Sequence, residues 1–252
     1  MTPSTSLHDT FNSLGLKKVA QSLDEIIAEA VRDALSPAVL LERTARLELD
    51  DRRTRSFDNR LRKSHLGRAA PLADFDWNHP RAIDRLRVDE AFTLRFIDDG
   101  GSVIFLGNTG TGKTHLARAL VERSLAAGHR AVFVDAHALC LDLARQGTTA
   151  ALDRRLRFYT RPHLLCIDEL ARQHIDIHRL DLLYELVRRR YHARRAVVVT
   201  SGLAFAEWPS VMPSTDATAA LIDRLVHRAL VIHIDADSYR QAQAARAAAR
   251  HR

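Results

Sequence analysis

The 252-residue chain is poor in the features that mark secreted and membrane proteins. It has two cysteines, and one of them, Cys166, lies in the apolar run 164–167, so we expect a small buried side chain and no disulfide. No apolar run approaches the ~18 residues that cross a bilayer, and the first residues lack a charged start followed by an apolar stretch. We therefore expect no secretion, no membrane insertion and a cytoplasmic location.

A zinc site is not expected either, although the chain has 13 histidines. His137 with Cys140 and His174 with His178 are isolated pairs, whereas a structural zinc site needs a second pair at matching spacing. Charge is more informative, because Lys and Arg outnumber Asp and Glu by 38 to 31 and the pI is near 10. This balance favours a polyanionic partner, with nucleic acid as the leading candidate.

The first part of the sequence has a helical pattern and a local excess of positive charge. Apolar residues recur at three- and four-residue steps on both sides of Gly15, and Ser36-Pro37 is typical of the cap and first turn of a further helix. Residues 43–68 hold nine basic and four acidic side chains, which predicts either a DNA-contacting segment or a solvated charged surface. Residues 67–80 have turn composition, so we place a boundary near residue 70, between a helical basic domain (1–70) and a second domain (71–252).

The second domain alternates apolar runs with helical stretches. Pro80 is expected to open a helix that ends at Asp98-Asp99-Gly100-Gly101. Strands that are covered by helices on both faces have no polar alternation, and five later runs are of this kind. The sequence therefore predicts an α/β fold with a doubly wound parallel sheet. The five runs are Val103–Leu106, Ala131–Val134, Leu164–Ile167, Ala196–Thr200 and Leu230–Ile234.

A glycine-rich loop lies between the first predicted strand and the next helical stretch. Glycines allow backbone N–H groups to approach a phosphate closely, and the amino end of a helix favours the negative charge. The loop has the P-loop pattern, in which the lysine reaches the β- and γ-phosphates and the following threonine ligates Mg²⁺, so it predicts a site for ATP and Mg²⁺. Its expected nucleotide-binding residues are Gly107, Asn108, Thr109, Gly110, Thr111, Gly112, Lys113, Thr114 and His115.

An acidic pair follows the third predicted strand and completes the expected chemistry. Asp168 is placed to hold the magnesium ion, and Glu169 to orient or deprotonate an attacking water. A positive group on the leaving γ-phosphate is also needed, and Arg224 and Arg240 are candidates. In a chain so rich in arginine, a surface ion pair is the alternative interpretation of each.

Several segments, in order along nearly the whole chain, resemble the IstB-type ATP-binding proteins of insertion sequences, which are relatives of the DnaC helicase loaders within the AAA+ ATPases. They include Leu14-Gly-Leu, Asp74-Phe-Asp, the P-loop with His115, Ile167-Asp-Glu-Leu170, Phe205-Ala-Glu-Trp208, Asp223-Arg-Leu and Ser238-Tyr-Arg240.

The resemblance implies a P-loop (AAA+) ATPase domain over residues 71–252 and an ATP-dependent helper. Such a helper forms a homo-oligomer on double-stranded DNA and directs a cognate transposase to its target. It places Arg224 as the arginine acting on a neighbouring subunit's nucleotide and Arg240 near the second sensor. The helical region would contact the transposase or DNA.

One position departs from the family pattern. The family usually has Thr-Ser-Asn after the fourth strand, with the asparagine sensing the γ-phosphate, whereas this chain has Thr200-Ser201-Gly202. Either Thr200 or Ser201 substitutes for the asparagine, or hydrolysis is slow while nucleotide binding persists. Gly202 keeps open a second function, a nucleotide-gated DNA-binding module with little turnover. The shared domain plan keeps open a third, a helicase loader of DnaC type.

Overall fold

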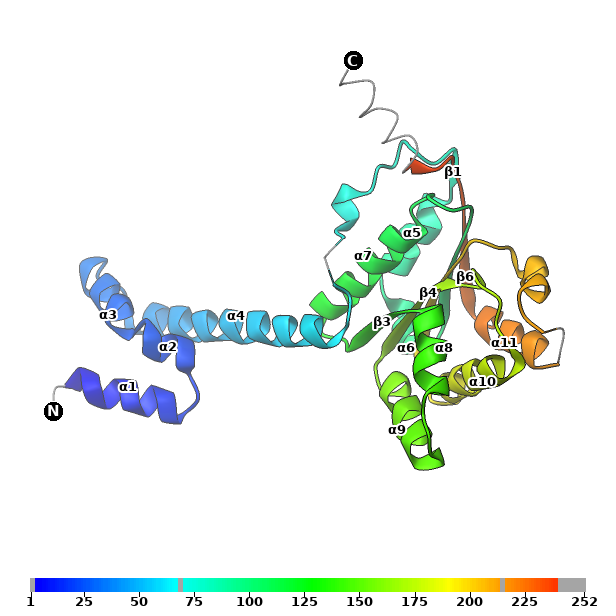
Figure 1. Cartoon of the computed structure of the whole chain (residues 1–252). Helices are drawn as coiled ribbons and strands as arrows, with labels where there is room; N and C mark the ends of the chain where they lie inside the picture. Colours follow the sequence, from blue (N-terminus) through cyan, green and yellow to red (C-terminus); the bar gives the residue numbers. More distant parts are fainter. Residues whose placement is uncertain (1–2, 68–69, 214–215, 240–252) are drawn as a thin grey trace, which may run out of the picture. The chain divides into compact units, whose positions relative to one another are not determined.

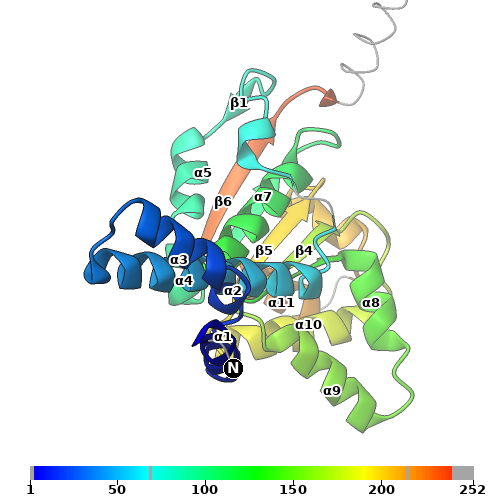
Figure 2. The same cartoon turned by 90° about the vertical axis from the view of Figure 1, so that its left-hand side faces the viewer.

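The computed structural model describes residues 3–67, 70–213 and 216–239. The chain forms two compact units, which we call the helical unit (residues 1–59) and the sheet unit (residues 60–252). Among the described residues, no helix is both long and apolar enough to cross a membrane. Figure 1 and Figure 2 label the helices and strands of both units.

The helical unit contains the four helices that precede the linker. They are α1 (Pro3–Ser13), α2 (Lys17–Gln21), α3 (Leu23–Arg32) and α4 (Pro37–Lys63), and the last turn of α4 belongs to the sheet unit. The start of α4 at Pro37 confirms the prediction from Ser36-Pro37, because the fixed φ of proline suits the first helical turn.

A buried carboxylate organises the helical unit. Glu48 of α4 is 3 % exposed and accepts the backbone N–H groups of Lys18 (2.9 Å) and Val19 (3.3 Å), which begin α2. It also accepts from Arg52 (3.1 Å) and Arg55 (3.3 Å). Burial opposes the charge, but the hydrogen bonds from Arg52, Val19 and Lys18 hold the pKa of Glu48 below its ordinary value. This carboxylate therefore ties α2 to α4 in its charged form.

The helical unit is not basic as a whole. It holds eight basic and ten acidic residues, whereas the sheet unit holds 30 and 21. Each of its six arginines forms an ion pair with a carboxylate of the same unit, and the chain's surplus of positive charge lies in the sheet unit. The pairs are Arg32–Asp33, Arg43–Glu29, Arg46–Glu42, Arg52–Glu48, Arg53–Asp50, and Arg55 with both Glu48 and Asp51.

The sheet unit is built on six strands in the order β1-β6-β2-β5-β4-β3. The last five strands in the chain are parallel to one another, and the short β1 pairs antiparallel with β6. All five predicted strands are present, which confirms the α/β prediction. Their bounds are β2 (Ser102–Leu106), β3 (Ala131–Asp135), β4 (Leu164–Leu170), β5 (Ala196–Ser201) and β6 (Ala229–Asp235), with β1 at Ala82–Ile83.

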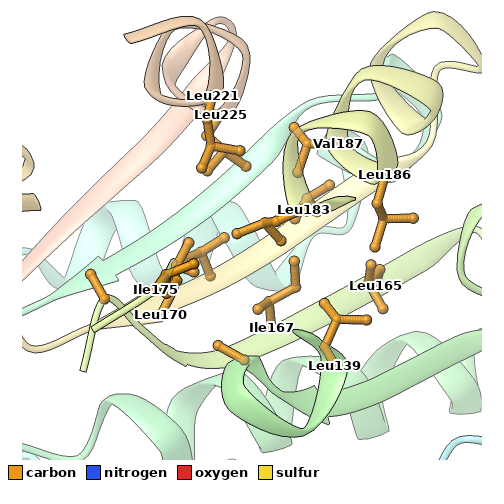
Figure 3. Packing of buried hydrophobic residues seen from close by; sticks show 14 of the residues in the cluster. Leu139, Leu165, Ile167, Leu170, Ile175, Leu183, Leu186, Val187, Leu221 and Leu225 are labelled. Carbon is orange, nitrogen blue, oxygen red and sulfur yellow. The ribbon is translucent and has the colours of Figure 1, made fainter. Parts of the chain in front are cut away.

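Helices cover both faces of this sheet. Helix α7 (Lys113–Ala126) packs on one face, and α8 (Ala136–Ala144), α10 (Ile177–His192) and α11 (Asp216–Val226) enclose the core cluster on the other. Figure 3 shows that Leu183 and Leu186 of α10 lie near Leu165 and Ile167 of β4, with Leu139 next to the same two strand residues. The sheet unit also contains α9 (Thr149–Thr160) and the 3-10 turns η1 (Leu72–Asp74) and η2 (Phe205–Ser210).

The helix predicted to open at Pro80 is wrong in its start and its continuity. Residues 82–83 form β1, and α5 (Arg85–Phe92) begins only after Asp84, whose side chain accepts the N–H of Arg87 as an N-cap. Leu94 then takes a left-handed backbone with φ of 66°, which separates α5 from α6 (Arg95–Asp99). Pairing of β1 with β6 overrides the helical periodicity of this segment.

A fully buried arginine joins the start of two strands to the end of a helix. Arg190 of α10 is 0 % exposed and donates to the carbonyls of Tyr159 (2.6 Å), Pro162 (3.2 Å) and Ala196 (2.5 Å), and to those of Thr160 and His163. Burial lowers the pKa of this guanidinium, which is held by carbonyl dipoles rather than by a carboxylate. Arg190 therefore fixes the carboxyl end of α9 against the entries of β4 and β5.

Candidate functional site

The predicted P-loop connects β2 to α7 at the carboxyl edge of the sheet, where β2 lies between β5 and β6. Strand order reverses at this point, and ligands of open α/β sheets bind in the crevice so formed. At two positions of the P-loop, neighbouring atoms leave room only for glycine. A Cβ on Gly107 would collide with the carbonyl oxygen of Ile234, and a Cβ on Gly112, whose φ is 95°, would lie 2.6 Å from the Phe75 ring.

The P-loop lysine is buried against its own loop. Lys113 is 9 % exposed, and its Nζ donates to the carbonyl of Asn108 at 2.6 Å and to the hydroxyl of Thr111 at 3.4 Å. The Thr111 hydroxyl also donates to Asn108, at 3.0 Å. The ammonium group therefore lies at the centre of the loop, where backbone N–H groups and the start of α7 add further positive potential.

One hydroxyl connects both acids of the predicted acidic pair. Thr200 is 0 % exposed, and its Oγ1 donates to Asp168 Oδ1 at 2.6 Å and accepts the N–H of Glu169 at 2.8 Å. Asp168 Oδ1 also accepts from the hydroxyl of Thr114, at 3.0 Å. The P-loop threonine, the two acids and a threonine of β5 thus form one hydrogen-bonded chain.

A β-bulge explains how two consecutive acids reach the same site. Strands β4 and β5 pair at Ile167 with Val199 and again at Leu170 with Ser201, so Asp168 and Glu169 together lie opposite Thr200. Glu169 takes a left-handed backbone with φ of 58°. Bulges interrupt the alternation of side chains along a strand and are frequent beside active sites.

Burial and hydrogen bonding act in opposite directions on Asp168. Burial raises the pKa of Asp168 above its ordinary value, and the nearby Glu169 raises it further, while the hydroxyls of Thr200 and Thr114 lower it. A desolvated carboxylate beside a hydroxyl is a donor set of hard oxygens, which suits Mg²⁺. Thr114 and Asp168 therefore fit the metal that a P-loop implies.

The second acid is paired with a cation from its own loop. The carboxylate of Glu169 forms an ion pair with the guanidinium of Arg172, three residues later, and this pairing raises the pKa of Arg172. Arg172 belongs to the Ala171-Arg-Gln-His stretch that follows the acids. Glu169 is part-exposed and lies on the wall of the cleft that contains the P-loop.

The P-loop opens into a cleft of about 850 Å³. Pockets that hold small molecules are typically ~300–1,000 Å³, so the volume is adequate for a nucleotide. His115, Glu169 and Gly202 line it together with Thr109–Thr114. Two further segments that sequence analysis did not assign to the site also contribute to the lining, with Asp74, Phe75, Asp76, His79 and Tyr239.

Both segments contact the P-loop, and they also contact each other. Phe75 packs against Gly112 and meets the ring of His115 at 5.7 Å, and His115 Nε2 lies 2.9 Å from the Pro71 carbonyl. Tyr239 donates its N–H to the Gly110 carbonyl at 3.0 Å and contacts the His79 ring at 4.8 Å. The Asp74-Phe-Asp and Ser238-Tyr segments stood out in the sequence only by family resemblance, because nothing local indicates that residues so far apart meet.

The remaining predicted residues are placed differently. The hydroxyl of Ser201 accepts the N–H of Leu203 at 3.2 Å, so it supports the following turn. Arg224 donates to the Ala220 carbonyl at 3.1 Å, and its guanidinium lies 4.9 Å from the centre of the Tyr184 ring, away from the residues that line the cleft. Arg240 lies outside the described residues.

Comparison with known proteins agrees with this geometry. Residues 9–247 match the family model described as "IstB-like ATP binding protein". The chain is 29 % identical over 235 residues to an insertion sequence IS5376 ATP-binding protein from Geobacillus stearothermophilus, with 93 % of both chains covered. It is 30 % identical over 236 residues to an insertion-sequence ATP-binding protein from Mycobacterium tuberculosis, covering 93 % of this chain and 94 % of that one.

Solved structures with low identity support the fold alone. The DnaC helicase loader superposes with a TM-score of 0.55 at 19 % identity, over 66 % of this chain and 97 % of that chain. DnaI superposes with a TM-score of 0.56 at 19 % identity, over 69 % of this chain and 91 % of that chain.

Proposed function

Because the chain belongs to the IstB-like ATP-binding proteins, we propose that it is an ATPase that forms a homo-oligomer on double-stranded DNA and directs a cognate transposase to its target. The hydrogen-bonded chain from Thr114 through Asp168 and Thr200 to Glu169 carries the catalytic part of this proposal. The names of the relatives, which are ATP-binding proteins of insertion sequences, support the biological part.

In the proposed ATP site, the P-loop amides and Lys113 hold the β- and γ-phosphates, and Thr114 and Asp168 hold Mg²⁺. Mg²⁺ held by Thr114 and Asp168 would neutralise charge that develops on the phosphate oxygens. Phe75, His79 and Tyr239, on the walls of the same cleft, offer ring surfaces for the nucleobase.

The proposed catalytic step depends on Glu169. Its carboxylate orients the attacking water and accepts a proton from it, after exchanging the ion pair with Arg172 for that contact. Arg224 acts on the nucleotide of a neighbouring subunit, which is consistent with its distance from the cleft lining of its own chain, and Arg240 is assigned to the second sensor. Residues 71–252 form the ATPase domain, and the helical domain 1–70 is assigned to the transposase.

Phosphate release with and without duplex DNA tests this proposal. Lys113→Ala should abolish ATP binding, and Glu169→Gln should retain binding but lose ~100-fold or more in turnover, since a positioned base contributes ~10²–10⁴. Asp181→Asn removes an exposed carboxylate of α10 outside the cleft and serves as the control. Turnover of Glu169→Gln at the rate of Asp181→Asn would show that the assigned base is wrong.

The role of Arg224 has a separate test. Arg224→Ala should bind ATP normally but hydrolyse it slowly, and a Lys113→Ala subunit that still carries Arg224 should restore activity in mixed oligomers. No restoration would leave Arg224 as a residue that only packs on Tyr184.

A second candidate function is a nucleotide-gated DNA-binding module with little turnover. Gly202 favours it, because this residue lines the cleft without a side chain, and the Thr200 hydroxyl is already used by both acids. ATP binding without phosphate release under either DNA condition would support this candidate. Capture of a replicative helicase rather than a transposase would instead support a helicase loader.

A further inference from the structure

The edge of the sheet opposite the P-loop carries an unusual repetition. Parallel strands all begin at one edge, and this amino edge is far from the carboxyl edge where the P-loop lies. The segments that lead into β3, β4, β5 and β6 each contain histidine together with arginine, and in the segment before β5 the histidine is the last residue of α10. Their sequences are His129-Arg130, Arg161-Pro-His163, His192-Ala-Arg194-Arg195 and His227-Arg228.

These segments are neighbours in space as well as repeats in sequence. The N–H of Arg130 donates to His163 Nδ1 at 3.1 Å, and the N–H of Ala196 donates to the His163 carbonyl at 3.1 Å. On the other side, the N–H of Ser102 donates to the Arg228 carbonyl at 3.3 Å. With strands ~4.8 Å apart, the five strand entries from β3 to β6 span about 19 Å.

Four arginines of the amino edge are not neutralised by a carboxylate among the described residues. Arg130, Arg161, Arg194 and Arg228 are exposed, and within the described part of the chain no ion pair or side-chain hydrogen bond is recorded for them. By contrast, Arg157 pairs with a carboxylate of its own helix. Further arginines of the sheet unit that pair with carboxylates are Arg81, Arg87, Arg155, Arg172, Arg179, Arg188 and Arg189.

Acidic residues do not cancel the charge of this edge. A hollow of about 540 Å³ is lined by Arg95, Arg194 and Arg228, and its acidic residues are Glu90, Asp98 and Asp99. The hollow alone is therefore balanced, but the segments 129–130, 161–163 and 192–195 add Arg130, Arg161 and Arg195 to the edge and contain no acidic residue.

Two of these arginines also occupy strained backbone positions. Arg194 has φ of 48° and Arg228 has φ of 61°, in the left-handed region that asparagine and glycine adopt more easily. A strained residue that persists is a reason to look for a function of its side chain. Both residues are exposed and line the hollow together with Arg95.

We propose that the amino edge of the sheet binds the phosphate backbone of duplex DNA through Arg130, Arg161, Arg194 and Arg228. Planar guanidinium groups match phosphate oxygens in pairs, and a duplex presents one phosphate charge per ~1.7 Å of axis, so a row of about 19 Å meets many of them. The helical unit is a poorer candidate, because it has more acidic than basic residues and its arginines are ion-paired. This inference specifies the DNA contact of the proposed function and leaves the nucleotide cleft untouched.

The test is an edge variant of the full chain with four substitutions, Arg130→Gln, Arg161→Gln, Arg194→Asn and Arg228→Asn. Asparagine is chosen at the two left-handed positions to protect the fold. The matched control removes the same charge from four arginines that are ion-paired elsewhere, by Arg46→Gln, Arg53→Gln, Arg157→Gln and Arg179→Gln. Binding of a 40-base-pair duplex is measured at 50 and 200 mM salt, and ATP binding by calorimetry.

The edge variant should bind the duplex at least ~100-fold more weakly at 50 mM salt, and the slope of log affinity against log salt should become shallower by about four, because each lost phosphate contact removes ~0.9. The control should bind like the parent, and all three proteins should bind ATP equally. An unchanged slope in the edge variant, equal weakening in the control, or a parent that does not bind the duplex would overturn the proposal. If the parent does not bind ATP, the proposed ATPase function is wrong, whatever the result for DNA.

Discussion

Replacing Thr200 by valine removes the hydroxyl that links Asp168 and Glu169, and so measures what this hydroxyl contributes. Valine keeps the β-branched shape of a fully buried strand residue, so packing inside β5 should be nearly unchanged. The substitution removes the bond to Asp168 Oδ1 (2.6 Å) and the acceptor of the Glu169 N–H (2.8 Å). Because both of these bonds go to the acids, we expect ATP affinity to change by less than about threefold.

The expected magnitudes follow from those two bonds. A hydrogen bond to a charged group is worth ~1.5–3 kcal/mol, and an N–H left unpaired in the interior costs ~1–3 kcal/mol. We therefore expect the free energy of unfolding to fall by about 2.5–6 kcal/mol. Loss of about 1.4–2.7 kcal/mol in positioning Glu169 would slow turnover by ~10–100-fold. The pKa of Asp168 should rise further, because the Thr200 bond lowers it, so Mg²⁺ should be lost at a higher pH than from the parent.

Three measurements check this reasoning, with Thr200→Ser as the control that keeps the hydroxyl. Urea unfolding gives the stability change, steady-state phosphate release gives the rate, and calorimetry at several Mg²⁺ concentrations reports on Asp168 without requiring turnover. The argument is refuted if Thr200→Val matches Thr200→Ser in stability, rate and Mg²⁺ dependence.

Three other changes have clear expected outcomes. Gly202→Asn should fold normally, because a Cβ there meets nothing within 4 Å, and should raise phosphate release above the parent by restoring a polar group in the cleft, with Gly202→Ala as the control. Arg190→Leu should lower the free energy of unfolding by ~3–5 kcal/mol in a urea titration, since several buried carbonyls lose their donor. Glu48→Gln should destabilise the chain at neutral pH; because the folded pKa of Glu48 is lowered, its contribution disappears as pH falls through that pKa, so thermal unfolding of parent and variant should converge in acid.

The strands, the P-loop and the acidic pair could be predicted from the sequence because each depends on residues that are close together in the chain. Buried parallel strands need continuous apolar runs, and all five predicted runs became strands. Parallel strands also place their carboxyl ends together, so the motif ending in Lys113 and Thr114 and the acids after the third run were expected to meet, and Thr114 does contact Asp168.

Other features depend on partners distant in sequence. Residues 82–83 became a strand only because β6 is available to pair with them, and no helical periodicity could reveal that. Phe75 and Tyr239 likewise contact the P-loop only in the folded chain, because both are far from it in sequence. The basic run over residues 43–68 was visible, but the pairing of its arginines with acids of α3 and α4 was not, because it depends on which helix turns face each other.

The bulge in β4 has a consequence for how such a protein could change. Its two acids lie opposite one residue of β5, so loss of the single residue Glu169 would leave Asp168 opposite Thr200 and restore an uninterrupted ladder. The metal ligand would remain and the proposed base would disappear, with no other strand displaced. Deletion of one codon would thus convert a chain equipped to hydrolyse its nucleotide into one that could only bind it.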